Sequence, residues 1–236
     1  MGLNPAGVTK NDTMNIGIYN KIKESLPKNV KLIAVSKTKP IEDIEKLYNI
    51  GQKSFGENKA QELSKKHETL NKDIEWHFIG HLQKNKIKYI APFVSLIHSI
   101  DSFSLLKEVN KFATKNNRII PCLLQFHIAT EETKFGFSLE ECVDMLKNQE
   151  FQSLKNIDIY GVMGMATFTD DEQQVRIEFK NLKNIFEKLK KEFFSNNENF
   201  KEISMGMTHD YKIAIEEGCT MIRIGSAIFG ERDYSK

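Results

Sequence analysis

The segment KLIAVSKTKPIEDIEKLYNIG (31–51) contains the pattern that decides the fold: a short β-rich run, a proline, and an amphipathic stretch that ends at a glycine. The run KLIAVSKT (31–38) is typical of a buried strand, and Pro40 with IEDIEKLYNI predicts a helix that ends at Gly51. A strand followed by a helix is the repeating unit of parallel sheets. The segment therefore predicts an α/β fold.

The same β-rich pattern recurs along the whole chain, between helix-like segments. The further runs are KSFGE (53–57), EWHFIG (75–80), SLIHSID (95–101), IIPCLLQFHI (119–128), DIYGVMGMA (158–166), EISMGM (202–207) and TMIRIGSAIFG (220–230). Eight strand–helix units in about 200 residues favour a closed (β/α)8 TIM barrel, because an open doubly wound sheet of this size usually has fewer strands.

The remaining segments are predicted to be helical, and no linker separates them. Asp170 and Asp171 are expected to cap a long helix, and an extra helix is expected around residues 16–26, before the first strand. No internal repeat or low-complexity tract interrupts the pattern. We expect one domain over residues 1–236, with residues 1–12 flexible.

The charge balance points to a small-molecule partner. The chain has 34 basic and 32 acidic side chains, a net charge of +2, which gives no field to attract nucleic acid or an anionic membrane. Lysines alternate at positions 84, 86 and 88 on a predicted helix, and we interpret them as a solvated face and not as a nucleic-acid patch. No apolar run approaches the roughly 18 residues of a membrane span. The 16 phenylalanines are interpreted as core.

Cysteine and histidine spacing argues against a disulfide framework and a metal site. Cys122, Cys142 and Cys219 are far apart and form no C-x-x-C motif, which suits a reducing cytosol. His77 and His81 have the i, i+4 spacing of zinc helices, but they lie at a strand end and lack the glutamate of H-E-x-x-H. The first residues carry no export signal, so a cytoplasmic protein without metal is expected.

Lys37 is the first candidate for chemistry. It ends the first β-rich run with the parity of Ile33 and Val35, so it points to the barrel mouth if those residues face inward. Active sites of such barrels lie at this end of the strands. Burial and the nearby Lys39 would both favour a neutral amine, which is the form that attacks an aldehyde. Considered alone, Lys37 also fits the commoner case of a surface lysine at a strand end.

Two loops have the composition of a phosphate site. Arg223 precedes Gly225 and Ser226 at the end of the eighth run, where backbone amides and a hydroxyl could donate to a phosphate. Gly206 and Thr208 end the seventh run and could supply the other half of the cradle. A TIM barrel often holds phosphate in these two loops. Each loop in isolation is also explained as an ordinary tight turn.

Taken together, these motifs resemble the pyridoxal phosphate homeostasis protein family, whose barrel is similar to the N-terminal domain of alanine racemase. The resemblance runs nearly from end to end. Its motifs are IAVSKTKP (33–40), FGEN (55–58), WHFIGHLQKNK (76–86), HSID (98–101), GVMGMA (161–166) and MIRIGSAIFGERDYSK (221–236).

The resemblance implies a pyridoxal 5′-phosphate cofactor and a set of residues around it. It implies that Lys37 carries the aldimine, that Asn58 lies against the cofactor, and that Arg223 faces the pyridine nitrogen. The residues implied around the ring and phosphate are Met207, Thr208, Gly225 and Ser226.

Several positions depart from the family's pattern. Thr208 and Ser226 stand where Ser and Thr are expected, and both exchanges keep a hydroxyl, so phosphate binding is expected to survive. His127 and Ala129 depart from the usual Asn and Ser-Gly turn of the fifth loop. The stretch 125–136 is therefore left out of the predicted site.

The resemblance implies a non-catalytic protein of intracellular vitamin B6 homeostasis that holds the cofactor and passes it to apoenzymes. The alternative is a racemase-like enzyme, which needs a base on each face of its substrate. In alanine racemase an added domain supplies the second base, and only a tail is expected after the eighth strand here. An arginine beside the pyridine nitrogen also weakens the ring as an electron sink. An aldolase that uses Lys37 without a cofactor is a third hypothesis. No catalytic residue is predicted.

Overall fold

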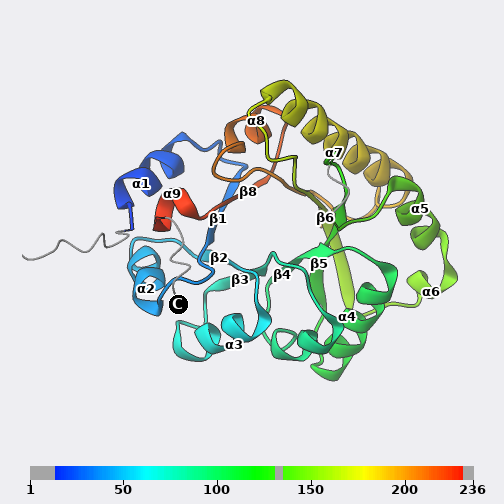
Figure 1. Cartoon of the computed structure of the whole chain (residues 1–236). Helices are drawn as coiled ribbons and strands as arrows, with labels where there is room; N and C mark the ends of the chain where they lie inside the picture. Colours follow the sequence, from blue (N-terminus) through cyan, green and yellow to red (C-terminus); the bar gives the residue numbers. More distant parts are fainter. Residues whose placement is uncertain (1–13, 131–134, 231–236) are drawn as a thin grey trace, which may run out of the picture.

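The computed structural model describes residues 14–130 and 135–230, and its strands form a closed ring with helices around the outside (Figure 1). The ring runs β1-β2-β3-β4-β5-β6-β7-β8 and closes where β1 pairs in parallel with β8. The strands are β1 (Lys31–Val35), β2 (Ser54–Glu57), β3 (Glu75–Phe78), β4 (Leu96–Ile100), β5 (Ile120–Phe126), β6 (Ile157–Gly164), β7 (Glu202–Ser204) and β8 (Met221–Ile224). The predicted (β/α)8 barrel is confirmed. Residues 1–12, predicted to be flexible, lie outside the described residues.

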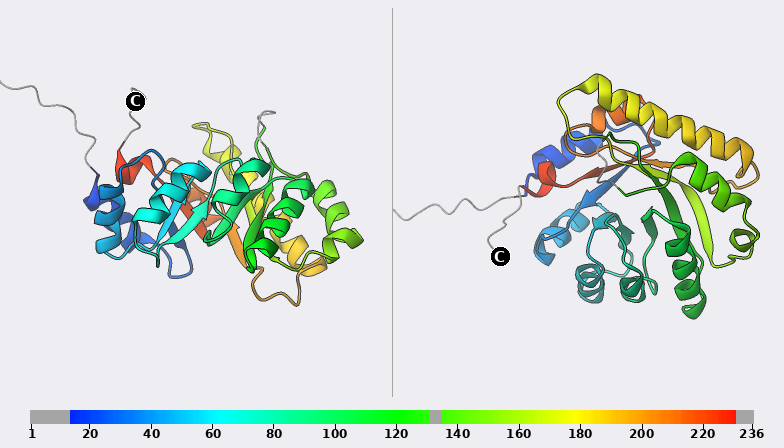
Figure 2. Two further views of the ribbon diagram at one scale, coloured as in Figure 1. Left: turned by 90° about the horizontal axis from the view of Figure 1, so that it is seen from below. Right: turned by 45° about the vertical axis from the view of Figure 1, so that its right-hand side comes forward.

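The helices form the outer layer of the barrel, which Figure 2 shows from two further directions. They are α1 (Ile16–Ser25), α2 (Ile41–Asn49), α3 (Ala60–Thr69), the 3-10 helix η1 (Lys84–Tyr89), α4 (Phe103–Lys115), α5 (Leu139–Lys147), α6 (Gln149–Gln152), α7 (Glu172–Glu192), α8 (Tyr211–Glu216) and α9 (Ser226–Phe229). The expected extra helix is α1, which lies beside α9 in Figures 1 and 2. The backbone N–H of Asn15 donates to the Ile228 carbonyl across 2.7 Å, which ties the two helices together.

Local sequence signals explain where several helices begin. The Asp171 carboxylate accepts hydrogen bonds from the N–H groups of Gln173 and Gln174 and caps α7, as the sequence predicts. Ser138 and Glu141 form a reciprocal capping box at the start of α5. These caps satisfy N–H groups that have no partner within the helix.

Alternation along the strands separates two apolar cores. Leu32 and Ala34 of β1 face outward and belong to the large core, which also contains Ile44 and Leu47 of α2. Between them in sequence, Ile33 faces the barrel interior, where it belongs to a small core with Leu96, Leu123, Met163 and Met221. Because side chains two residues apart in a strand lie on the same face, inward-facing residues continue to the carboxyl end of the barrel.

One sequence prediction of element type needs correction. The run 220–230 is a strand only to Ile224, and Ser226 to Phe229 form the short helix α9. An apolar run of this length does not distinguish a strand from a buried helix by periodicity, and Ile228 and Phe229 are fully buried in α9. The lysine-rich segment, predicted to be helical, forms the 3-10 helix η1.

The sequence predicted no membrane span and no disulfide framework, and the described helices and cysteines bear on these two predictions. No helix in the described part of the chain is long and apolar enough to cross a bilayer. Cys122, Cys142 and Cys219 are buried and free of disulfides, and burial raises the pKa of the Cys142 and Cys219 thiols to about 12. Thiols with pKa values this high carry almost no reactive thiolate near neutral pH.

Candidate functional site

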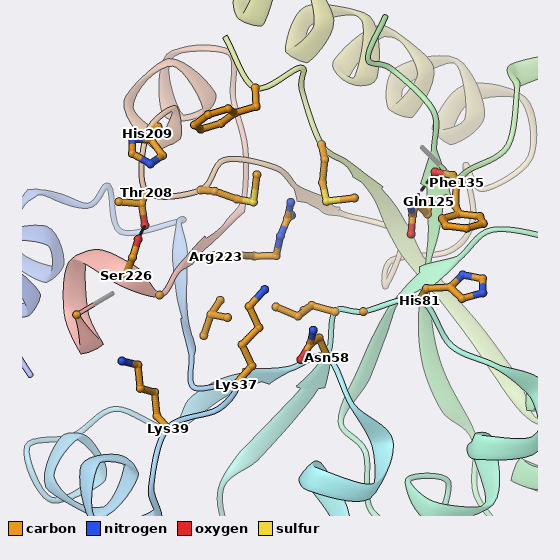
Figure 3. Close-up of a pocket in the computed structure, with 18 residues that line it drawn as sticks. Lys37, Lys39, Asn58, His81, Gln125, Phe135, Thr208, His209, Arg223 and Ser226 are labelled. Atoms are coloured by element: carbon orange, nitrogen blue, oxygen red, sulfur yellow. Dashed lines mark hydrogen bonds between the residues drawn. The ribbon is translucent and has the colours of Figure 1, made fainter. Parts of the chain in front are cut away.

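A cavity of about 460 Å³ opens at the carboxyl ends of the strands (Figure 3). It collects the inward-facing residues at the strand ends and the loops that follow. They are Val35, Lys37, Lys39, Asn58, Ile79, Gly80, His81, Gln125, Phe135, Met165, Phe168, Met207, Thr208, His209, Arg223, Gly225, Ser226 and Gly230. Every residue of the predicted cofactor site lines this single cavity.

Lys37 lies in the loop after β1, beyond the point where the strand itself ends. Val35 is the last strand residue and lines the pocket, as the inward parity predicts. Lys37 is partly buried, and Figure 3 shows its side chain pointing into the pocket towards Arg223. Thr38 has a φ of 64°, a left-handed conformation that is uncommon for a threonine. The loop therefore turns sharply directly after Lys37.

Arg223 is a buried cation beside the pocket. Its Nη1 donates to Ser204 Oγ across 2.7 Å, and its Nη2 donates to the Gly164 carbonyl across 3.2 Å. Burial lowers the pKa of the guanidinium to about 10, so the group stays charged at neutral pH. Both of these acceptors are neutral, so they satisfy N–H groups without cancelling the positive charge.

Behind Arg223, a column of polar side chains runs through the barrel interior. Ser204 Oγ lies 2.9 Å from Nδ1 of His98, and Nε2 of His98 lies 2.8 Å from Nδ1 of His77. Burial lowers the pKa of both histidines, that of His77 to about 3, so both rings are neutral. Because Ser204 accepts from Arg223, it can donate to His98, which can in turn donate to His77.

The two loops with phosphate-site composition meet at the pocket wall. Ser226 Oγ donates to Thr208 Oγ1 across 3.2 Å, which places the hydroxyls of the seventh and eighth loops together (Figure 3). Gly206 has a φ of 91°, a conformation that favours glycine. A Cβ on Gly225 would lie 3.2 Å from the Cβ of Val35, so glycine here also lets the loop pack against β1.

Asn58 has an unsatisfied atom. Its Oδ1 is buried and has no hydrogen-bond partner among the described residues. A buried polar atom without a partner is costly, and a bound molecule can supply one. Together with an amine, a buried cation and paired hydroxyls, this atom makes the pocket fit a phosphorylated aldehyde cofactor such as pyridoxal phosphate.

The outer part of the pocket was not predicted from the sequence. Gln125 and Phe135 line it, although the fifth-loop stretch was left out of the predicted site. Phe135 and Phe168 are 57% and 79% exposed and so are not core, as the phenylalanines were interpreted to be. Phe135 stacks on His81 and Phe168 meets His209 edge-on, and Figure 3 shows the two histidines on opposite sides of the pocket. What marks these residues as part of the pocket is that they are exposed aromatic side chains. The amino-acid composition does not show which aromatic side chains are exposed.

The contact between His77 and His98 was also not predicted from the sequence. The sequence predicted no metal site. His77 and His98 are far apart in sequence and meet only because β3 and β4 are neighbours. Within residues 14–130 and 135–230, no group of three or more His, Cys, Asp or Glu side chains is arranged to hold a metal ion.

Comparison with known proteins gives consistent matches. The family model for the alanine racemase N-terminal domain matches residues 19–233. A pyridoxal phosphate homeostasis protein of Aquifex aeolicus is 42% identical over 86% of this chain and 88% of its own length. PipY of Synechococcus elongatus, solved without pyridoxal phosphate, is 30% identical with a TM-score of 0.84 and coverage of 91% and 99% of the two chains. The structure of PipY with pyridoxal phosphate bound is 29% identical with a TM-score of 0.82, again covering 91% of this chain and 99% of its own.

These matches span almost all of the chain and nearly the full length of the relatives. They agree with the closed barrel and with the motifs that the sequence carries. The chain therefore belongs to the pyridoxal phosphate homeostasis protein family, within the alanine racemase N-terminal domain family.

Proposed function

We propose that this chain binds pyridoxal 5′-phosphate at Lys37 and holds it for intracellular vitamin B6 homeostasis, without turning over a substrate of its own. The observation that carries the proposal is the convergence of the Lys37 amine, the buried Arg223 and the hydroxyls of Thr208 and Ser226 in one cavity. Support also comes from the relatives named pyridoxal phosphate homeostasis protein and from PipY, which has been solved with pyridoxal phosphate bound.

The pocket residues have distinct tasks in this proposal. Pyridoxal phosphate supplies an aldehyde that condenses with an amine, an aromatic ring and a phosphate. Lys37 provides the amine, and Thr208 and Ser226 provide hydroxyls for the phosphate. Arg223 faces the ring nitrogen, Asn58 offers its unsatisfied amide oxygen, and the side chain of Met207 lies at the ring. Gly225 allows the backbone of the eighth loop to approach.

Arg223 favours holding the cofactor over using it. A guanidinium that remains charged near the ring nitrogen disfavours protonation of that nitrogen. An unprotonated ring withdraws electrons weakly and so gives little help to carbanion chemistry. Ser204 and the Gly164 carbonyl hold the guanidinium through neutral acceptors, so these two hydrogen bonds do not cancel its charge.

We further propose that the protein works in the cytoplasm and passes the cofactor to pyridoxal phosphate-dependent apoenzymes, without binding nucleic acid. The net charge of +2 offers no attraction for nucleic acid. Three free, buried cysteines suit a reducing compartment. Transfer to an apoenzyme would show as loss of the cofactor's absorbance from this protein with matching recovery of apoenzyme activity.

The attachment site is tested with two lysines that share the pocket. The purified protein is loaded with pyridoxal phosphate, its absorbance is recorded before and after borohydride, and the modified peptide is identified by mass spectrometry. We expect Lys37→Ala to lose the absorbance band and the reduced adduct. Lys39→Ala is the matched control, since Lys39 also lines the pocket, and should keep both. An unchanged spectrum and adduct in Lys37→Ala would assign the site to another lysine.

A further inference from the structure

A buried ionic network lies next to the Lys37 loop, outside the set of pocket-lining residues. Lys66 of α3 and Glu57 of β2 are 5% and 0% exposed. Lys66 Nζ lies 2.8 Å from Glu57 Oε1 and 2.7 Å from Glu62 Oε1. We call Glu57, Glu62 and Lys66 the loop clamp. Figure 1 shows α3, which carries two of its members, on the outer side of the barrel near β2 and β3.

The loop clamp contacts both chain neighbours of Lys37. On one side, Ser36 Oγ donates to Glu57 Oε1 across 2.6 Å, and Lys66 Nζ donates to the Ser36 carbonyl across 2.8 Å. On the other side, the Thr38 backbone N–H donates to Glu62 Oε1 across 2.6 Å. The residue between these two anchored positions is Lys37.

The conformation of Thr38 explains why the loop needs this support. Its φ of 64° lies in the left-handed region, which costs free energy for a threonine and persists only where the surroundings hold it. Glu62 accepts the amide of this same residue. Without that acceptor, the chain after Lys37 can return to an ordinary conformation, and the direction of the Lys37 side chain changes with it.

Stability alone does not account for the loop clamp. Taking charged groups out of water is costly, and buried ion pairs are often replaceable by apolar residues without loss of stability. Burial raises the pKa of Glu57 to about 7 even though Lys66 and Ser36 both donate to it, so burial disfavours the charged carboxylate more than these donors favour it. A reactive side chain, by contrast, gains from neighbours held by fixed hydrogen bonds.

We propose that Glu57, Glu62 and Lys66 are positioning residues that aim the Lys37 amine into the pocket by fixing the backbone at Ser36 and Thr38. This inference rests on the proposed function, in which Lys37 is the attachment site. The loop clamp acts through the loop and touches no part of the bound molecule. It also links the two strand ends that deliver Lys37 and Asn58, because Glu57 immediately precedes Asn58.

Glu62 is the member of the loop clamp best suited to a test, since its side chain is 23% exposed and the variant is expected to fold. Glu62→Ala removes the acceptor of the Thr38 amide, whereas Glu62→Gln keeps an acceptor oxygen. The matched control is Glu108→Ala, because Glu108 of α4 has a 27% exposed side chain and also pairs with a lysine of its own helix. Thermal unfolding of all variants checks that their stabilities are comparable.

Two measurements report on the loop clamp. Hydrogen exchange of the Thr38 amide in the cofactor-free protein should be at least about fivefold faster in Glu62→Ala, equivalent to one lost hydrogen bond. Stopped-flow condensation with pyridoxal, which lacks the phosphate, should slow by about the same factor if Lys37 is misdirected. Glu62→Gln should recover most of both values, and Glu108→Ala should match the wild type.

The possible results separate this inference from the proposed function. Unchanged exchange at Thr38, or faster exchange with an unchanged condensation rate, would overturn the positioning role while the adduct on Lys37 remained. If Glu62→Ala and Glu108→Ala changed the exchange and condensation rates equally, the effect would be general destabilisation, which would also overturn the positioning role. A borohydride adduct on another lysine in the wild-type protein would instead remove the proposed function, and the inference with it.

Discussion

Asn58 lies where it does because the residue behind it has no side chain. A Cβ added to Gly80 would lie 2.4 Å from the Asn58 carbonyl oxygen and 2.7 Å from its Cα, which are impossible contacts with backbone atoms. Gly80 follows β3 and Asn58 follows β2, so this close approach brings two adjacent strand ends together at the pocket. A single missing atom thus determines the position of a candidate cofactor ligand.

Gly80→Ala tests this close approach. The added methyl group must displace the Asn58 backbone, so we expect the affinity for pyridoxal phosphate to fall by about tenfold or more, with a stability loss of roughly 1–3 kcal/mol from overpacking. Both are measured by titration and by urea unfolding. Gly17→Ala in α1 is the control, since its new Cβ would meet no atom closer than 3.4 Å. Wild-type affinity in Gly80→Ala would show that Asn58 does not contribute to binding.

The Thr208 and Ser226 hydroxyls lead to a prediction about the phosphate. Pyridoxal phosphate should bind much more tightly than pyridoxal, because charge-assisted hydrogen bonds to a dianion are stronger than neutral ones. Ser226→Ala should weaken binding of the phosphate form by about tenfold, the value of one such bond, and leave pyridoxal binding unchanged. Gly225→Val should cost more, since the new side chain would press on Val35. Equal dissociation constants for the two ligands, by absorbance titration, would remove the phosphate cradle from the proposal.

At the scale of elements, four strands together build the polar column beside the pocket. β3, β4, β7 and β8 contribute His77, His98, Ser204 and Arg223, each on the inward face of its strand. Neutral side chains fill the barrel interior behind the Arg223 guanidinium. One of them, Ser204, accepts a hydrogen bond from the guanidinium. Burial disfavours the charged form and so lowers the pKa of both histidines, which keeps both rings neutral in this arrangement.

The low pKa of His77 predicts sensitivity to acid. An unfolded histidine binds a proton near pH 6.5, whereas His77 in the folded protein does so only near pH 3. Between these pH values the unfolded state binds more protons than the folded state. The contribution of neutral His77 to the free energy of unfolding is therefore fully present above pH 6.5 and is lost as the pH falls. For His77 alone the free energy of unfolding should drop by about 2 kcal/mol between pH 7.5 and pH 5.

Urea unfolding of the wild type and of His77→Asn at several pH values isolates this effect. Asparagine keeps an acceptor for His98 but does not titrate, so the variant should lose less stability on acidification. Glu57 acts in the opposite direction, because burial raises its pKa to about 7 and the folded state is favoured as the pH falls through that value. The comparison between two proteins that share Glu57 cancels its contribution. Parallel pH profiles would contradict a neutral, buried His77.

At the scale of the whole molecule, closure of the barrel gathers every candidate ligand at one end. The ends of seven of the eight strands, or the loops that follow them, line the same cavity, and β4 is the exception among the described residues. The helices contact the strands from outside and contribute to the site indirectly, as α3 does through the loop clamp. Two exposed aromatic residues, Phe135 and Phe168, line the outer part of this cavity.

The whole molecule is also the scale at which catalysis is tested. Cofactor-loaded protein is incubated with a panel of L- and D-amino acids, and enantiomer conversion, keto-acid formation and amine release are scored. We expect no racemase, transaminase or decarboxylase turnover near 1 per second, a rate at the low end for enzymes. The reason is that Arg223, which we propose faces the pyridine nitrogen, stays charged and disfavours protonation of that nitrogen. Turnover at that rate, abolished by Lys37→Ala, would instead support a racemase-like enzyme.

The sequence by itself determined the barrel, its extra helix and the candidate ligands. Strand and helix patterns such as 31–51 are local, and a parallel barrel places every strand's carboxyl end on one face. The sequence therefore assigns Lys37, Arg223 and the seventh and eighth loops to one site, and the family resemblance adds Asn58 and Met207.

Only the tertiary structure decided which side chains meet across strands and between a strand and a helix. The His77–His98 pair, the contact of Lys66 with Glu57, and the contribution of Phe135 to the pocket all join residues that no local spacing relates. These contacts depend on how strands and helices far apart in the chain pack together when the barrel closes, which no local sequence pattern specifies. For the same reason the sequence predicted that α9 was the end of the eighth strand. An apolar run indicates that a segment is buried but not whether it is a strand or a helix.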